Sequence, residues 1–355
     1  MENPTHFTII PTTSCNARCF YCYEECYKKE TMSEKTISNL SKYIVSNISN
    51  EFILDLYGGE PLLCVEMIDK LINQIKNSVD LYKLNWYSVI TTNASLFSPE
   101  LVDHVVDEWN LKVAHITIDG NESEHNIRKN IKGINSFRQT KRSILMLLKK
   151  NVYVNLRIHL DKNNYLSLES IFSEIKEFFK YENFRAFPTY LFPPENNDDS
   201  SQYFKDSEKE ELFSFVFKTM LELGLIDNLV QLLPVPKNTS CSAMNSKQIV
   251  IAPDGSFHRC VQEFSGNDFC SDEKFLSISI QDMCVICKDL PICLGGCRHN
   301  YEKKGTMPCM RSHYIIMPLQ TLQKTLLKTS SLMNSKIILP ILLFQKTFWR
   351  LEELI

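Results

Sequence analysis

Residues 11–25 read PTTSCNARCFYCYEE and place three cysteines in one short loop after a predicted β-strand. Cys15, Cys19 and Cys22 have the spacing C-x3-C-x2-C. Three thiolates on one loop can bind three irons of a [4Fe–4S] cluster and leave the fourth iron open to a substrate or cofactor. A structural zinc site prefers four protein ligands. Cys26 lies within range, but a four-cysteine site with this spacing would be unusual, so zinc is the weaker alternative.

The composition is that of an ordinary globular protein. The chain has 355 residues, 44% of them hydrophobic and 23% charged, and a net charge of −3. This length suffices for one large domain and a smaller one, and the charge argues against nucleic-acid binding. The N-terminus lacks the pattern of a signal peptide, and no run of 18 apolar residues suggests a transmembrane span. These features predict a cytoplasmic protein.

Thirteen cysteines are the unusual feature of the composition. The odd count, the length and the missing signal peptide favour reduced thiols over a secreted disulfide scaffold, and clustered reduced thiols indicate metal binding. An early group contains Cys15, Cys19, Cys22, Cys26 and Cys64. A late group contains Cys241, Cys260, Cys270, Cys284, Cys287, Cys293, Cys297 and Cys309.

Strand-like and helix-like segments alternate between residues 7 and 191. The predicted strands are short and rich in β-branched or aromatic residues, and amphipathic helical patterns fill the gaps. Six β/α units in series imply a parallel sheet, either doubly wound or a partial barrel, with the site at the carboxyl ends of the strands. The predicted strands are 7–12, 52–57, 86–91, 113–118, 152–160 and 184–190.

The rest of the chain divides by composition. Residues 195–211 are polar and acidic, and the apolar helical pattern of 212–226 follows. The cysteine-rich region has few apolar runs, so bound metal is expected to contribute to its folding. The tail predicts one or two helices that pack on the body, and an interfacial membrane helix is the weaker alternative. The predicted domains are 1–194, the core; 195–236, a linker with a helical segment; 237–310, the cysteine-rich domain; and 311–355, the tail.

The cysteine loop, with Tyr21 directly before its third cysteine, resembles the signature of radical S-adenosylmethionine (SAM) enzymes. The resemblance implies an α/β fold, a partial (β/α)6 barrel with a C-terminal cysteine-rich auxiliary iron–sulfur domain. It implies a [4Fe–4S] cluster on Cys15, Cys19 and Cys22 whose open iron binds SAM. Reductive cleavage would yield methionine and a 5′-deoxyadenosyl radical that removes hydrogen from an unactivated carbon. Tyr21 would lie against the adenine.

The stretch YGGEP, residues 57–61, follows the second predicted strand and resembles the GGE motif of that family. The resemblance implies that Gly58, Gly59 and Glu60 hold the amino group of SAM. Glycines let a backbone approach closely, and a carboxylate binds an ammonium group through charge-assisted hydrogen bonds. Alone, such a stretch would more often be a turn.

Three further stretches resemble family segments that follow the third, fourth and fifth strands: TTNAS (91–95), ITIDGNESEHNIRK (116–129) and NLRIHLDKNN (155–164). Ala94 and His159 depart from the pattern, which commonly has glycine and asparagine there. The resemblance implies that five residues face the SAM and substrate cavity, namely Thr92, Asn93, Thr117, Asp119 and Arg157.

Asp119 and Arg157 are the predicted catalytic residues of this set. We expect Arg157 to bind the SAM carboxylate. The alternative for Arg157 is a strand arginine paired with a neighbouring acid. The alternative for Asp119 is an Asp-Gly turn without a chemical role.

The order of the late cysteines resembles the seven-cysteine SPASM domain, which binds auxiliary [4Fe–4S] clusters in peptide-modifying radical SAM enzymes. The resemblance implies one cluster on Cys284, Cys287, Cys293 and Cys309, and a second on Cys241, Cys260 and Cys297. Cys270 is either the fourth ligand of the second cluster or a free thiol. A pair of zinc ribbons is the structural alternative.

The resemblance favours maturation of a ribosomal precursor peptide through a thioether or carbon–carbon crosslink. One alternative is anaerobic sulfatase maturation, which oxidises Cys or Ser to formylglycine. Such enzymes have an aspartate base directly after the equivalent of Cys260, whereas Val261 cannot accept a proton. A second alternative is a non-enzymatic iron–sulfur electron-transfer protein.

The expected partners are a precursor peptide and a flavodoxin- or ferredoxin-type reductant. Only fourteen residues precede Cys15, which leaves no room for an N-terminal leader-binding module. Leader recognition would then fall to a separate protein, to residues 196–236 or to the tail. Oxygen-labile clusters suggest the cytoplasm of an anaerobe.

Overall fold

The computed structural model describes residues 5–48, 50–191, 201–205, 208–225, 241–262, 282–287 and 290–299. The chain divides into two compact units. The first unit comprises residues 1–203 and 241–278, and the second comprises residues 204–240 and 279–355. The predicted ligands Cys270 and Cys309 lie outside the described residues.

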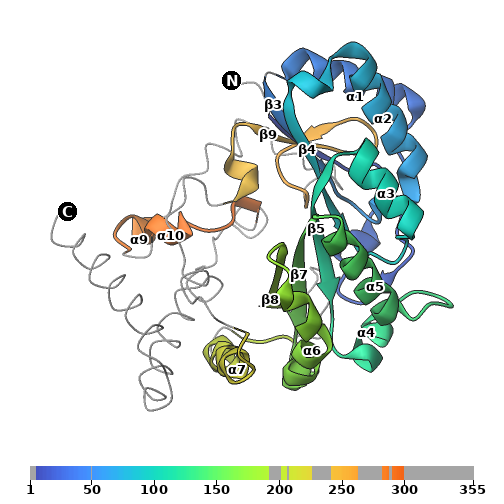
Figure 1. Cartoon of the computed structure of the whole chain (residues 1–355). Helices are drawn as coiled ribbons and strands as arrows, with labels where there is room; N and C mark the ends of the chain where they lie inside the picture. The colour runs from blue at the N-terminus through green and yellow to red at the C-terminus, as the bar shows by residue number, and fades with distance from the viewer. Residues whose placement is uncertain are drawn as a thin grey trace. The chain divides into compact units, whose positions relative to one another are not determined.

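The first unit is built on a mainly parallel sheet (Figure 1). Six of its strands are mutually parallel and follow one another across the sheet in chain order. A doubly wound sheet would reverse this order at one point, so the winding is that of a partial barrel. The prediction of six strands and this fold class is confirmed. The strands are β1 (His6–Ile9), β3 (Glu51–Leu56), β4 (Asn85–Thr92), β5 (Leu111–Ile118), β7 (Tyr153–Leu160) and β8 (Phe184–Tyr190).

Helices cover one face of this sheet, as Figure 1 shows. Strand residues alternate between the two faces, and those on the helix side, such as Leu54 and Ile116, are almost completely buried. Many of the residues between them are polar and are partly buried or exposed on the other face, which we call the polar face. It carries Asp55, His115, Thr117, Arg157 and His159. The helices are α1 (Glu34–Asn47), α2 (Val65–Ser78), α3 (Pro99–Glu108), α4 (Glu122–Arg128), α5 (Ser136–Lys149) and α6 (Leu168–Ile175).

Two further strands extend the sheet beyond β1. β9 (Gln248–Ile251) pairs with β1 in parallel, and β10 (Phe257–His258) pairs with β9 in antiparallel orientation. The sequence analysis missed both strands because they are short and lie between cysteines of the late group. The boundaries 237–310 of the cysteine-rich domain stay a prediction.

A separate two-stranded ladder fixes the cysteine loop. β2 (Arg18–Cys19) pairs with β6 (Lys129–Asn130), so that Cys19 lies opposite Lys129. This pairing ties the loop to the chain that leaves α4. The sequence analysis missed it, since strands of two residues carry no pattern.

The second unit contains three described helices, namely α7 (Lys209–Glu222), α9 (Asp282–Val285) and α10 (Leu290–Cys293). α7 overlaps the apolar helical pattern predicted for 212–226. Among the described residues, no helix combines the length and the apolar character that crossing a bilayer requires.

Candidate functional site

The cysteine loop lies directly after β1, where a parallel sheet places its sites. Cys15, Cys19 and Cys22 are partly buried and form no disulfide. The Cys22 amide donates to the Cys19 carbonyl at 3.0 Å, which closes a turn between two of the thiols. Within the described ranges, no three Cys, His, Asp or Glu side chains form a group that could hold one metal ion.

The thiols of this loop are protonated in the absence of a metal. Burial raises the pKa of Cys19 to about 12 and that of Cys22 to about 11, and it also raises the pKa of Cys15. Two donors, the Ala17 amide at 3.4 Å and Asn93 Nδ2 at 3.7 Å, point at Cys15 Sγ and favour its thiolate. Cluster binding must therefore release protons from the loop.

The two glycines of YGGEP pack against the backbone that leads into the cysteine loop. A Cβ atom on Gly58 would lie 2.5 Å from the Thr12 carbonyl oxygen, and one on Gly59 would lie 2.2 Å from that of Ser14. Gly58 also has a φ of +117°, which disfavours other residues. The sequence analysis assigned this close approach to SAM. In the structure the approaching partner is the chain itself.

Glu60 is completely buried and joins the ends of β3 and β4. Its Oε1 accepts from Thr92 Oγ1 at 2.7 Å and from the Leu62 amide at 3.1 Å, and its Oε2 accepts from the Asn93 amide at 2.8 Å. Burial raises the pKa of this carboxyl group. Its observed role is to brace this edge of the sheet, and its contact with the SAM amino group stays a prediction.

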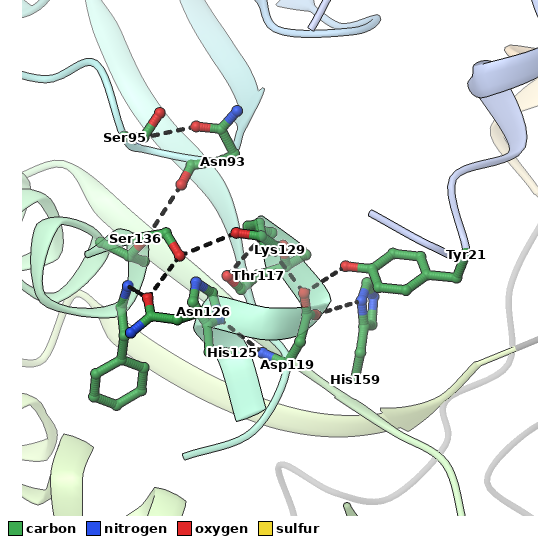
Figure 2. A network of polar contacts seen from close by, with 12 residues as sticks. Tyr21, Asn93, Ser95, Thr117, Asp119, His125, Asn126, Lys129, Ser136 and His159 are labelled. Atoms are coloured by element: carbon green, nitrogen blue, oxygen red, sulfur yellow. Dashed lines mark hydrogen bonds and ion pairs between the residues drawn. The ribbon is translucent and has the colours of Figure 1, made fainter. Parts of the chain in front are cut away.

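Asn93 links the end of β4 to the cysteine loop. Its Nδ2 donates to Asn16 Oδ1 at 2.8 Å, and its Oδ1 accepts from the Ser95 amide at 2.9 Å. Figure 2 shows Asn93 beside Ser95. Through Glu60 and Asn93, three stretches that are distant in sequence meet at one edge of the sheet.

Asp119 is the centre of a buried polar network (Figure 2). Its Oδ2 accepts from the Tyr21 hydroxyl at 2.7 Å, its Oδ1 lies 3.1 Å from His159 Nδ1, and Lys129 Nζ lies 4.0 Å from Oδ2. Burial alone would raise the pKa of Asp119, but Lys129 and His159 outweigh it and hold the pKa well below its usual range. An ionised carboxylate with three side-chain partners is more than a turn residue.

Tyr21 contributes its hydroxyl group to this network. Its ring meets His159 edge-on, with the ring centroids 5.1 Å apart. Burial raises the pKa of Tyr21 well above its usual value, so the phenol stays neutral. Its contact with adenine stays a prediction.

Lys129 is a buried cation that the sequence analysis did not identify. Only 2% of its surface is exposed, and its ammonium group donates to the Thr117 carbonyl at 3.0 Å and to Thr117 Oγ1. The predicted cavity residue Thr117 is thus engaged by Lys129. A lysine directly after a predicted helix gives no sign of burial in the sequence. Lys129 lies in the β2–β6 ladder, which no local sequence pattern predicts.

Arg157 lies on the polar face and is exposed. Its guanidinium group lies 5.8 Å from the centroid of the Phe187 ring, and it forms no ion pair with any residue that the structure describes. The alternative of a paired strand arginine is therefore wrong for the described residues. A guanidinium group without an acidic partner suits a carboxylate ligand.

The late cysteines fall into both units. Cys241 and Cys260 lie in the first unit and pack against the same buried residue, Ala243. The structure therefore brings together two of the three ligands predicted for the second auxiliary cluster. Four others lie in the second unit on or near α9 and α10, namely Cys284, Cys287, Cys293 and Cys297. The auxiliary clusters stay a prediction.

A parallel β/α sheet with three thiols on the loop after its first strand defines the class, an α/β enzyme with a metal-cluster site. The family model of the radical SAM superfamily matches residues 9–180. The chain is 26% identical over 333 residues to the cysteine-type anaerobic sulfatase-maturating enzyme of Clostridium novyi (strain NT), a match that covers 82% of this chain and 87% of the relative.

Two solved structures are similar in fold. Native anSMEcpe with bound AdoMet and Cp18Cys peptide has a TM-score of 0.67 at 19% identity, covering 92% of this chain and 97% of that one. SuiB of Streptococcus suis bound to its precursor peptide SuiA has a TM-score of 0.59 at 14% identity, covering 86% and 74%.

Residues 9–180 therefore form a radical SAM domain. This superfamily uses a [4Fe–4S] cluster and SAM. The residues present fit both cofactors, since the loop offers three thiols without disulfides and Arg157 offers a cation that pairs with no acid among the described residues.

Proposed function

We propose that the enzyme matures a ribosomal precursor peptide by forming a thioether or a carbon–carbon crosslink. The observation that carries this proposal is the shared fold. The fold is shared with anSMEcpe over 92% of the chain and with SuiB over 86%, and the solved structures of both proteins contain a bound peptide. The polar face supplies side chains that can bind the backbone of an extended peptide.

The proposal assigns a role to each part of the site. When bound, the cluster and SAM supply a 5′-deoxyadenosyl radical that removes a hydrogen atom from the peptide. Cys15, Cys19 and Cys22 hold the cluster, while Glu60 and Asn93 keep the loop and the end of β4 in register. Fixed geometry matters here because hydrogen transfer requires the reacting atoms to be in near contact.

In the proposal, Arg157 binds the carboxylate of SAM and Asp119 holds Tyr21 beside the cofactor. The auxiliary cysteines bind clusters that accept the electron left on the substrate. The reductant is a flavodoxin or ferredoxin, and a separate protein, residues 196–236 or the tail binds the leader. The cytoplasm is the proposed location.

Sulfatase maturation is the second candidate, because the relative from Clostridium novyi carries that name. Against it stands Val261, an apolar side chain directly after Cys260, where the resemblance expects an aspartate base. The electron-carrier alternative is set aside, since the superfamily consists of enzymes.

The test uses enzyme reconstituted with iron and sulfide under anaerobic conditions. Two probes are offered, a peptide encoded by a short reading frame beside the gene and a sulfatase peptide with the motif C-x-P-x-R. Mass spectrometry distinguishes a crosslink, which removes two hydrogen atoms, from formylglycine, in which oxygen replaces the cysteine sulfur. Modification of the sulfatase peptide alone would overturn the proposal in favour of the second candidate.

Two variants serve as controls for the chemistry. Cys19→Ala removes a cluster ligand, and Glu60→Gln exchanges an acceptor oxygen for an amide donor in the buried brace. Both should release far less 5′-deoxyadenosine than the wild type. Equal release from all three proteins would contradict the assigned site.

A further inference from the structure

We infer that His159 is the base that accepts the proton lost by the substrate, and that Asp119 orients its ring. This inference rests on the proposed function, because a crosslinking reaction must dispose of one proton. His159 lies near the carboxyl end of β7, and Asp119 directly follows β5, the neighbouring strand. Figure 2 shows Tyr21 and His159 reaching Asp119 from one side, with Lys129 and Thr117 on the other.

The hydrogen bond between these residues fixes the tautomer of His159. An ionised carboxylate only accepts hydrogen bonds, so His159 Nδ1 must donate to Asp119 Oδ1, 3.1 Å away. In a neutral ring the lone pair then belongs to Nε2. The side chain is 12% exposed, and among the described residues Nε2 has no hydrogen-bond partner. Nε2 is therefore the basic nitrogen of the ring, and the hydrogen bond at Nδ1 fixes the orientation of the ring.

The charges around His159 keep it neutral. Among the described residues, four titratable or charged groups face it: Tyr21 from the cysteine loop, Asp119 after β5, Lys129 from β6 and Arg157 from β7. Burial and the two cations lower the pKa of His159, and these effects outweigh Asp119, which raises it. A neutral imidazole at ordinary pH is ready to accept a proton.

The position of His159 suits this role. Arg157, two residues earlier on the same strand, points to the same face of the sheet because strand side chains alternate. Tyr21 lies against the His159 ring. The proposed function assigns both residues to SAM, so the base and the radical would act from one side of the sheet.

The proton balance for a thioether is as follows. A hydrogen atom leaves the substrate carbon for the deoxyadenosyl group, and the carbon radical forms a bond to the sulfur of a substrate thiol. The S–H proton passes to His159 Nε2. The remaining electron passes to an oxidised iron–sulfur cluster, the class of acceptor that the late cysteines predict. For a carbon–carbon crosslink the proton comes from the second carbon instead.

The decisive variant is His159→Asn, which introduces a side chain that cannot act as a base. Its amide can still donate to Asp119 but cannot take up a proton. We expect wild-type cluster content, SAM binding and 5′-deoxyadenosine release, while crosslinked product falls about 100-fold, the typical contribution of a general base. The wild-type product rate should fall as the pH is lowered, since the protonated ring is no base, and the variant should lack this fall.

A second readout does not depend on turnover. Imidazole nitrogen NMR shifts of the reconstituted holoenzyme, with His159 identified by its absence from His159→Asn, should show a protonated Nδ1 and a bare Nε2. The opposite tautomer would overturn the inference. Wild-type amounts of crosslinked product from His159→Asn would also overturn it. Loss of SAM binding in that variant would overturn it too, because His159 would then be a structural residue. If the wild type modifies no peptide at all, the proposed function fails, and the tautomer still tests the geometry of His159.

Discussion

The two groups of cysteines are held by different kinds of structure. Around the early loop, partners lie far apart in sequence: Cys19 pairs with Lys129, and Glu60 bonds to Thr92 and Asn93. In the described stretch from Cys284 to Gly296, the backbone hydrogen bonds outside the helices join residues three or four apart, and α9 and α10 have four residues each. Long-range hydrogen bonds and burial preform the first site without its metal. In the described part of the second, the backbone hydrogen bonds are local.

The two sites should therefore differ in how much bound metal contributes to their folding. A site stabilised by a buried carboxylate can have nearly its final geometry before its cluster binds. A site made of short turns gains its stability when thiolates bind metal. The four predictions below test this contrast, in order of expected effect.

Removal of iron should affect the two regions most unequally. A structural zinc site contributes on the order of 10 kcal/mol to folding, and we expect a cluster site to act in the same sense. When a chelator strips the reconstituted enzyme, amides of residues 282–299 should therefore lose their protection against hydrogen exchange, whereas β3 and β4 should keep theirs. Hydrogen exchange followed by mass spectrometry measures both regions in one sample. Equal loss in the sheet and in the late segment would refute the contrast.

Gly59→Ala should strongly damage the early site. Its Cβ would lie 2.2 Å from the Ser14 carbonyl oxygen, so the backbone before Cys15 must move. We expect a loss of about 4 kcal/mol in the free energy of unfolding, measured with urea, together with lower iron content.

The matched control is Gly133→Ala. Gly133 has a φ of +75° and no atom near its added Cβ, so it should cost only about 1 kcal/mol. Equal losses for the two variants would mean that the contact with Ser14 is not what demands glycine.

The sequence predicted the sheet well because each of its six strands is a short run with its own turn signals. It missed β9 and the β2–β6 ladder, since pairing between distant short segments leaves no local pattern. The order of cysteines predicts a cluster site, but nothing in the sequence tells whether a ligand is braced by strands or by turns.

The candidate site was predicted by residue type better than by contact. Gly59 approaches the Ser14 backbone closely, a contact that the sequence did not predict, and its approach to SAM stays a prediction. Arg157 could have been paired, and the fold leaves it without a described acid. The sequence analysis missed Lys129, because its burial depends on a short ladder that no sequence pattern predicts.

Lys129→Met should have the next largest effect. The substitution removes the cation 4.0 Å from Asp119 and the donor to the Thr117 carbonyl. Breaking a buried charge pair typically costs about 3 kcal/mol. Urea unfolding of the holoenzyme measures the loss. The exposed Lys132→Met is the control and should change stability by less than about 0.5 kcal/mol. Similar values for both lysines would show that the network around Asp119 does not stabilise this edge of the sheet.

The smallest effect is a pH dependence that belongs to the early site alone. His125 accepts a hydrogen bond from the Asp119 amide at 3.1 Å, and burial together with Lys129 lowers its pKa to about 3. Its ordinary value is 6.5, so between these values acid protonates the unfolded chain first. Stability must then fall as the pH falls, because the folded-state pKa is the depressed one.

This linkage predicts a loss of about 1 kcal/mol in the free energy of unfolding between pH 6.5 and 5.5. This pH range lies above the range in which protonation of Asp119 would also begin to lower the free energy of unfolding. Other groups with shifted pKa values contribute to the absolute slope, so the measured quantity is the difference between the wild type and His125→Gln. That difference should shrink by about 1 kcal/mol over the window, since the variant has no imidazole to protonate. An unchanged difference would mean that His125 is protonated as easily in the fold as in the unfolded chain, and that the edge of the sheet around Asp119 admits water.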